Sequence, residues 1–173
     1  SNIKYNNMIM FGNLPYNISS KILVNWIKIN NLKEYCKRFV LMFQKEVADR
    51  IVANYNSSKY GRLSILSSWK MNIKKVMDIN PESFYPSPKV KSSLLLFEPK
   101  VTFHKLKDPK TLEHVTNVFF NQRRKMIKKP LKILFNNFQE IAELLSLDMN
   151  LRPQNLNNIT YYKICSEYEK LFK

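Results

Sequence analysis

The sequence is poor in glycine and in cysteine. It has only two glycines, Gly12 and Gly61, and two cysteines, Cys36 and Cys165, among its 173 residues. Domains that bind a nucleotide-like cofactor usually carry several glycines in one loop, and neither GxGxxG nor GxxxxGK[ST] occurs here. We therefore expect either that no such cofactor binds, or that the segment that binds it lies outside this chain. Two cysteines without a CxxC or Cys/His cluster predict reduced, partly buried thiols, with no disulfide framework and no metal site.

Acidic residues and long apolar runs are also scarce. There are 13 Asp and Glu residues against 29 Lys and Arg, which gives a net charge of +16. Such an excess suits a polyanionic partner: RNA, DNA or an anionic membrane. The run Phe39–Phe43 is among the longest apolar stretches, far short of the roughly 20 residues that span a bilayer. No signal peptide is visible at the start. We therefore expect a nucleic acid partner, no membrane partner and a cytoplasmic location.

Apolar residues are abundant enough, at 45%, to bury a core. Apolar runs and turn residues predict strands at 8–11, 39–43, 71–79 and 92–97, and helices at 19–27, 44–52 and 63–69. Beyond about residue 100 the patterns predict helices alone, at 111–120, within 125–135, at 138–145 and at 161–172. This change predicts an α/β part over 1–100 and a small helical part over 101–173.

The tetrapeptide Asn13-Leu14-Pro15-Tyr16 directly follows the predicted strand 8–11 and Gly12. A short apolar run that ends in turn residues predicts a buried strand of a parallel sheet, and open α/β sheets bind ligands at the carboxyl ends of such strands. An Asn amide oxygen and nearby carbonyls can accept hydrogen bonds from an amino group, while a Tyr ring stacks on a flat base. The alternative is an ordinary strand-to-helix turn.

A second motif runs from Phe84 to Val90 and contains Pro86 and Pro88. Prolines two residues apart hold a loop extended and stiff. We expect this loop to present Phe84 opposite Tyr16, as the second wall of an aromatic clamp. The alternative is a proline-rich turn whose Phe fills the core.

The densest basic cluster follows Asn121. Arg124 and Lys128, like Lys125 and Lys129, are four residues apart, so a helix would align them in a positive stripe that suits phosphate binding. The alternative is a solvated helix face, and Pro130 predicts a kink or the start of a new helix. The candidate RNA-binding residues are Arg62, Lys89, Arg123, Arg124, Lys125, Lys128 and Lys129. The turn at 60–64 either faces RNA or caps a helix.

Together these motifs resemble the KsgA family of ribosomal RNA adenine N6,N6-dimethyltransferases. The resemblance covers nearly the whole chain and runs, in order, through residues 12–19, 44–50, 60–64, 84–90 and 120–125. Related 23S-type resistance methyltransferases share the scaffold, but usually carry Ile at the position of Leu14. A DNA adenine methyltransferase would have Asp or Asn followed by two prolines, and Leu14 argues against it.

The resemblance implies a Rossmann-like S-adenosylmethionine-dependent methyltransferase domain followed by a small all-helical RNA-binding domain. Residues 1–100 would be the C-terminal portion of the first and 101–173 the second. The family's acidic residue and Gly-x-Gly-x-Gly loop are absent from this sequence. We therefore expect a truncated chain, with most of the S-adenosylmethionine site outside it, and a fragment that is inactive alone.

The resemblance also implies roles for the first two motifs in methylating adenines of 16S rRNA during ribosome biogenesis. Asn13 and the Leu14–Pro15 backbone would accept both amino hydrogens of adenine, and Asn13 would touch the methionine end of the cofactor. Tyr16 and Phe84 would cover the two faces of the base. The helical domain would bind the RNA of the small (30S) subunit, with the protein as a monomer. The alternative is a non-catalytic RNA-binding or ribosome-assembly factor on the same scaffold.

Overall fold

The computed structural model describes residues 8–172, and these form two compact units. The first contains residues up to 52 and residues 67–103, and the second contains residues 53–66 and those from 104 onward. The segment 53–66 therefore groups with the C-terminal helices, although two strands of the first unit follow it in the sequence. The division predicted from the sequence, at residue 100, assigns this segment to the first part, and the status of the two parts as separate domains stays a prediction.

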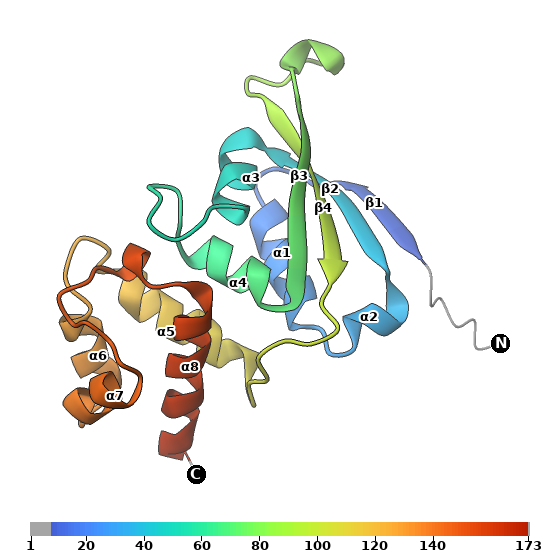
Figure 1. Cartoon of the computed structure of the whole chain (residues 1–173). Helices are drawn as coiled ribbons and strands as arrows, with labels where there is room; N and C mark the ends of the chain where they lie inside the picture. Colours follow the sequence, from blue (N-terminus) through green and yellow to red (C-terminus); the bar gives the residue numbers. More distant parts are fainter. Residues whose placement is uncertain (1–7, 173) are drawn as a thin grey trace. The chain divides into compact units, whose positions relative to one another are not determined.

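A four-stranded sheet forms the centre of the first unit (Figure 1). Its strands are β1 (Ile9–Asn13), β2 (Arg38–Gln44), β3 (Met71–Ile79) and β4 (Ser92–Pro99), in the spatial order β1-β2-β4-β3. β1 and β2 are parallel, whereas β4 is antiparallel to both of its neighbours. The four predicted strands are thus confirmed, together with the predicted mixture of strands and helices.

The core of this unit forms around β2 and β4. Leu41, Phe43, Leu95 and Phe97 are fully buried, and the rings of Phe43 and Phe97 lie 6.0 Å apart. The surrounding helices are α1 (Ser19–Lys28), α2 (Leu32–Tyr35), α3 (Lys45–Ile51) and the end of α4 (Arg62–Lys70). The predicted helices at 19–27, 44–52 and 63–69 are confirmed within one or two residues at most ends.

The prediction that the first strand is buried is wrong. β1 is parallel to β2, as expected, but it is an edge strand, and the side chains of Ile9 and Phe11 are 46% and 75% exposed. The reason is its position: among residues 8–172, only β2 pairs with β1, so its other edge has no neighbouring strand. An apolar run predicts a strand, but it does not reveal which strands flank it.

The β3–β4 hairpin brings its connecting loop to the carboxyl ends of β1 and β2. Gln44, the last residue of β2, pairs with Ser92, the first residue of β4. Ile79, the last residue of β3, pairs with the same serine. Residues 80–91 therefore leave the sheet at the edge where Asn13 ends β1, and they include the short 3₁₀ helix η1 (Pro81–Ser83).

A cluster of ion pairs joins this hairpin to α3. Asp78 lies 2.7 Å from the Lys45 amine and 2.6 Å from the Lys75 amine. Lys75 also lies 3.0 Å from Asp49, and the Ser93 hydroxyl donates to Asp78 at 2.6 Å. The hydrogen bond from Lys45, followed by those from Lys75 and Ser93, holds the pKa of Asp78 well below its usual range.

We expect this cluster to make the stability of the protein sensitive to acid. The pKa of Asp78 is lower in the folded state than in the unfolded state. Its carboxylate therefore stabilises the fold above the pKa that it has in the unfolded chain, and this stabilisation is lost as the pH falls from about 5 to about 2. Urea unfolding of the Asp78→Asn variant should therefore show a smaller loss of stability over this range than the wild type. The control Glu46→Gln changes an exposed carboxylate outside the cluster, and equal acid sensitivity of wild type and Asp78→Asn would contradict the prediction.

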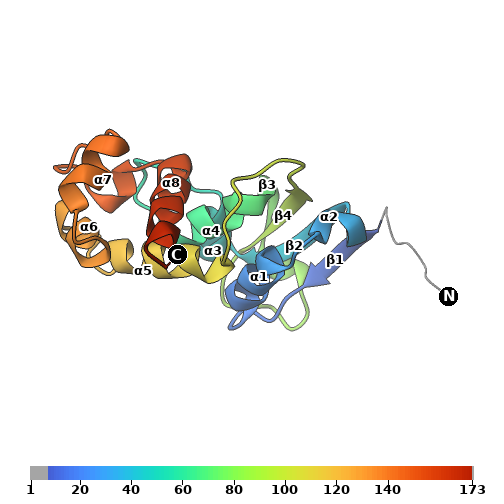
Figure 2. The same cartoon turned by 90° about the horizontal axis from the view of Figure 1, so that it is seen from below.

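The second unit is a helical bundle. Its helices are α5 (Pro109–Phe120), α6 (Lys128–Leu134), α7 (Phe138–Leu144) and α8 (Asn158–Glu169), with short 3₁₀ helices η2 (Pro153–Asn155) and η3 (Lys170–Phe172). α8 runs beside α5, and α6 lies next to α7 (Figure 2). Asp108 begins α5 as its N-cap, since its side chain accepts a hydrogen bond from the Lys110 amide, and Pro109 occupies the first helical position. The predicted C-terminal helices are confirmed.

Aromatic residues fill the interior of the bundle. Phe119 and Tyr161 are fully buried, with ring centroids 5.3 Å apart. Tyr60, from the segment 53–66, is also fully buried and packs edge-on against Phe120 at 6.2 Å. This contact explains why the segment groups with the helices.

Two further features concern the whole described part of the chain. Cys36 and Cys165 are free thiols, and both are buried rather than partly buried as predicted. Among residues 8–172, no helix is long and apolar enough to cross a membrane, and no group of three or more His, Cys, Asp or Glu residues could hold a metal ion.

Candidate functional site

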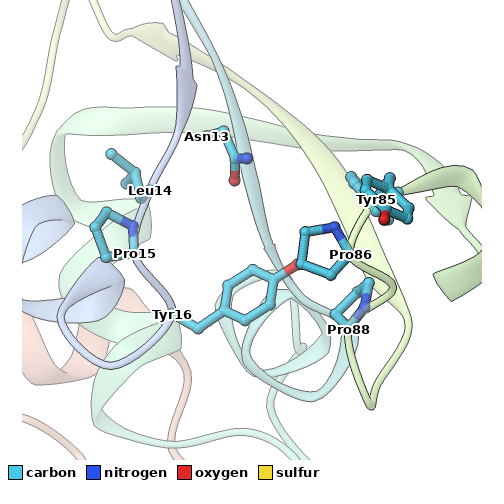
Figure 3. Close-up of a pocket in the computed structure, with 8 residues that line it drawn as sticks. Asn13, Leu14, Pro15, Tyr16, Tyr85, Pro86 and Pro88 are labelled. Carbon is cyan, nitrogen blue, oxygen red and sulfur yellow. The ribbon is translucent and has the colours of Figure 1, made fainter.

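The two motifs selected from the sequence line one pocket of about 380 Å³ in the first unit (Figure 3). Its lining residues are Asn13, Leu14, Pro15, Tyr16, Phe84, Tyr85, Pro86 and Pro88. The Asn13 side chain points into the space between the Leu14–Pro15 side and the Tyr85–Pro86 side. The five residues predicted to handle the base, Asn13 to Tyr16 and Phe84, are therefore brought together.

The first wall is a strand–turn–helix segment. Asn13 is the last residue of β1, and the Ile18 amide donates to the Pro15 carbonyl at 3.1 Å, which closes a turn directly before α1 begins at Ser19. Proline fixes its own φ, so the chain reverses at a defined position after the strand. The tetrapeptide is thus a strand-to-helix turn, and it also lines a pocket.

Two hydrogen bonds hold Tyr16 at its two ends. Its hydroxyl lies 2.6 Å from the hydroxyl of Ser92, and its backbone carbonyl accepts a hydrogen bond from the Ser19 hydroxyl at 3.2 Å. Ser92 is fully buried at the start of β4, so its position is set by the sheet. The ring of Tyr16 is therefore oriented before any ligand binds.

We expect the Tyr16–Ser92 bond to contribute about 1 kcal/mol to stability, since Tyr16→Phe would leave a buried serine hydroxyl without this partner. The free energy of unfolding from urea titration should fall by about that amount for Tyr16→Phe and for Ser92→Ala. The double variant should lose less than the sum of the two single losses. Strictly additive losses would show that the two hydroxyls do not interact.

The second wall is the loop between β3 and β4. The Phe84 amide donates to the Pro81 carbonyl at 3.1 Å, and the Ser87 hydroxyl donates to the same carbonyl at 2.8 Å. These bonds close the loop on itself. Of this wall only Phe84 was predicted from the sequence. Tyr85, Pro86 and Pro88 also line the pocket, and all three belong to the loop that was predicted to be stiff. The side chain of Tyr85 is completely exposed.

None of the eight lining residues carries a charge at neutral pH. The pocket offers one amide, backbone carbonyls, two phenol rings, a phenyl ring and proline rings. Such a lining suits a neutral, flat group that has hydrogen-bond donors on its edge, and it provides neither cations for a phosphate nor a carboxylate as general base. A nucleobase with an exocyclic amino group has these properties.

The predicted helical stripe of basic residues is wrong in its geometry. α5 ends at Phe120, residues 121–125 form turns, and α6 begins only at Lys128. Arg124 and Lys128 therefore do not lie on one helix. Pro130 is the physical reason: it lacks an N–H and is tolerated in the first turn, so a new helix begins just before it, as one of the two predicted alternatives stated.

The candidate RNA-binding residues differ in how free their charges are. Arg62 donates to the Asn117 side chain at 2.9 Å, and Arg123 donates to the Ser58 carbonyl, so both help to hold the helical unit together. The remaining five, Lys89, Arg124, Lys125, Lys128 and Lys129, are exposed. Lys89 belongs to the first unit and the other four belong to the second.

Comparison with known proteins points to one family. The family model of ribosomal RNA adenine dimethylases matches residues 2–173. The chain is 57% identical, over 99% of its length, to ribosomal RNA small subunit methyltransferase A of Pelagibacter ubique. It is 45% identical, over 86% of its length, to the protein of that name from Ehrlichia chaffeensis. The chain spans 65% and 55% of the lengths of these two relatives.

Solved structures show the same fold. A dimethyladenosine transferase from Plasmodium falciparum superimposes with a TM-score of 0.76 at 27% identity, over 94% of this chain and 66% of that one. The 23S rRNA methyltransferase ErmE superimposes with a TM-score of 0.61 at 15% identity, over the same shares, which supports the fold alone. The predicted Rossmann-like methyltransferase architecture is confirmed, and the chain belongs to the ribosomal RNA adenine dimethylase family.

Proposed function

We propose that this protein dimethylates the N6 amino group of adenines in small-subunit ribosomal RNA during ribosome biogenesis. The observation that carries the proposal is the uncharged pocket, at the carboxyl end of β1, that both the Asn13 amide and the Tyr16 ring line. Membership of the adenine dimethylase family and the net charge of +16 support an RNA substrate.

Asn13 would act on the adenine amino group by position. The N6 lone pair is delocalised into the ring, so this nitrogen is a poor nucleophile. If the Asn13 amide oxygen and a carbonyl of Leu14 or Pro15 accept its two hydrogens, the nitrogen is held with its lone pair directed at the methyl donor. Such orientation can supply several kcal/mol of the barrier without a general base, which agrees with a pocket that contains no carboxylate.

Tyr16 and Phe84 would cover the two faces of the base. Tyr16 is already fixed by Ser92, and Phe84 comes from the opposite, stiff loop. Aromatic stacking of this kind compensates for the energy needed to take an adenine out of a helix or loop.

S-adenosylmethionine is the methyl donor of the proposed reaction. The described residues provide only a small part of a site for it. Asn13 would touch its methionine end, as the family resemblance implies. No pocket-lining residue is a carboxylate that could hold its ribose or ammonium group, and Gly12 and Gly61 are the only glycines in the sequence. The residues of this chain therefore fit the base better than they fit the donor.

The RNA partner would be the small (30S) ribosomal subunit. The protein would bind it as a monomer, in the cytoplasm. The exposed cations Arg124, Lys125, Lys128 and Lys129 would contact phosphates from the helical unit, and Lys89 would do so beside the pocket. Arg62 and Arg123 would support RNA binding mainly by stabilising the helical unit through their hydrogen bonds.

The proposal is tested with the protein expressed from the complete coding sequence that contains this chain. Small subunits from cells that lack adenine dimethylation are incubated with it and with S-adenosylmethionine carrying a labelled methyl group. The RNA is then digested to nucleosides and separated. We expect labelled N6,N6-dimethyladenosine. Binding to the subunits without any labelled adenine would overturn the proposal and favour a non-catalytic assembly factor.

A further inference from the structure

A second cavity, of about 460 Å³, lies in the helical unit where α5 begins and α8 ends. α5 contributes Lys110, Thr111 and His114, and the turn before it contributes Lys107 and Asp108. Tyr168 and Glu169 of α8 and Phe172 of η3 complete the lining. None of these residues belongs to the motifs described above.

Three aromatic rings line this cavity and contact one another. The rings of His114 and Tyr168 lie 5.3 Å apart at an angle of 33°, and those of Tyr168 and Phe172 lie 5.2 Å apart at 67°. Behind them, the buried ring of Phe135 packs edge-on against Tyr168 at 5.9 Å. Tyr168 is therefore held from the core, while Phe172 is 74% exposed and His114 is also exposed. An exposed ring surface supported from beneath is suited to stacking.

The charged residues of the cavity divide into two groups. The carboxylate of Glu169 accepts hydrogen bonds from the backbone amides of Lys107 and Asp108, at 2.9 and 3.0 Å, and the carboxylate of Asp108 accepts one from the Lys110 amide at 2.8 Å. Both carboxylates thus hold the turn that starts α5. The amines of Lys107 and Lys110 belong to exposed side chains at the same turn.

We propose that this cavity binds one unpaired nucleotide of an RNA strand. The base stacks on one of the two exposed rings, His114 or Phe172, which Tyr168 supports, and the amines of Lys107 and Lys110 contact the adjoining phosphates. Proteins bind single-stranded nucleic acid with exposed aromatic rings that lie beside cations. The net charge of +16 also favours a polyanionic ligand over a neutral or cationic one. The inference rests on the proposed function only in taking RNA as the ligand, since the adenine pocket lies in the other unit.

The test is equilibrium binding of the 173-residue chain, without any methyl donor, to a fluorescein-labelled single-stranded oligo(A) RNA of about 12 nucleotides. The double variant His114→Ala/Phe172→Ala removes two exposed rings and leaves Tyr168, which packs on the core, in place. We expect its Kd to rise about tenfold, because stacking of one base on an aromatic ring has an effect of that size. Leu171→Ala is the matched control, since Leu171 is 51% exposed next to Phe172 but does not line the cavity. Its Kd should stay within about twofold of the wild type.

A second measurement locates the contact. RNA that carries 4-thiouridine is photo-crosslinked to the wild-type chain, and the modified peptide is identified by mass spectrometry. We expect the crosslink within residues 164–172 or 107–114. Equal affinities of the double variant and the wild type, or crosslinks confined to other segments, would overturn the inference while leaving the proposed methylation intact. If the wild-type chain does not bind the RNA at all, both this inference and RNA binding by the helical unit fail.

Discussion

Replacing Asn13 by alanine is expected to lower the rate of methyl transfer to small-subunit RNA about 100-fold. Asn13 is the only lining residue with a side-chain amide, so its loss removes the acceptor that would hold the adenine amino group. A misplacement of about 1 Å at a reacting atom can cost this much in rate. The measurement is the initial rate of labelled methyl incorporation into undermethylated small subunits, with the protein expressed from the complete coding sequence.

Two results separate this role from a general effect on folding. Asn17→Ala is the matched control: Asn17 is an exposed asparagine in the same turn that does not line the pocket, so its rate should stay within about twofold of the wild type. The urea midpoint of Asn13→Ala should also stay close to that of the wild type, because Asn13 is exposed. A fully active Asn13→Ala variant would show that the amide does not position the base.

Replacing Tyr60 by alanine is expected to destabilise the helical unit by about 3–5 kcal/mol. Tyr60 is fully buried, its hydroxyl donates to the side chain of Asn158 at 2.6 Å, and its ring packs on Phe120. Burial also raises the pKa of its hydroxyl, so the group stays protonated and can serve as a donor. A loss of this size is a large fraction of the stability of a typical domain, and it should be measured as a lower midpoint in urea unfolding followed by circular dichroism.

Two further variants divide this effect into its parts. Tyr60→Phe keeps the ring and removes only the hydrogen bond to Asn158, so it should cost about 1 kcal/mol. Tyr55→Ala alters a half-exposed tyrosine of the same segment and should change stability by less than about 0.5 kcal/mol. If Tyr60→Ala were no more destabilising than Tyr55→Ala, the segment 53–66 would not be an integral part of the helical unit.

The candidate pocket was largely predictable because its two halves are continuous motifs. Asn13 to Tyr16 and Phe84 to Pro88 each combine turn-forming prolines with residues that can bind a base, and such combinations are visible along the chain. That the two motifs meet was a weaker inference, since Phe84 lies 68 positions after Tyr16 in the sequence. The pairing of Gln44 with Ser92 brings the loop to the end of β1, and that pairing is a property of the sheet.

The basic cluster shows the opposite case. A spacing of four residues aligns side chains only if one helix contains both, and here a turn separates Arg124 from Lys128. The cluster of His114, Tyr168 and Phe172 could not be predicted from the sequence either, because more than 50 residues separate His114 from Tyr168. No periodicity along the sequence links such residues.

The kinds of secondary structure, the change from strands to helices near residue 100 and the two motifs of the pocket could all be predicted from the sequence. These depend on local properties, namely the spacing of apolar residues and the conformational limits of proline. Three features became visible only in the folded chain: β1 is an edge strand, the segment 53–66 packs with the helices, and Ser92 orients Tyr16. Each of these depends on contacts between residues far apart in the chain, and local preferences carry no information about which distant partners meet.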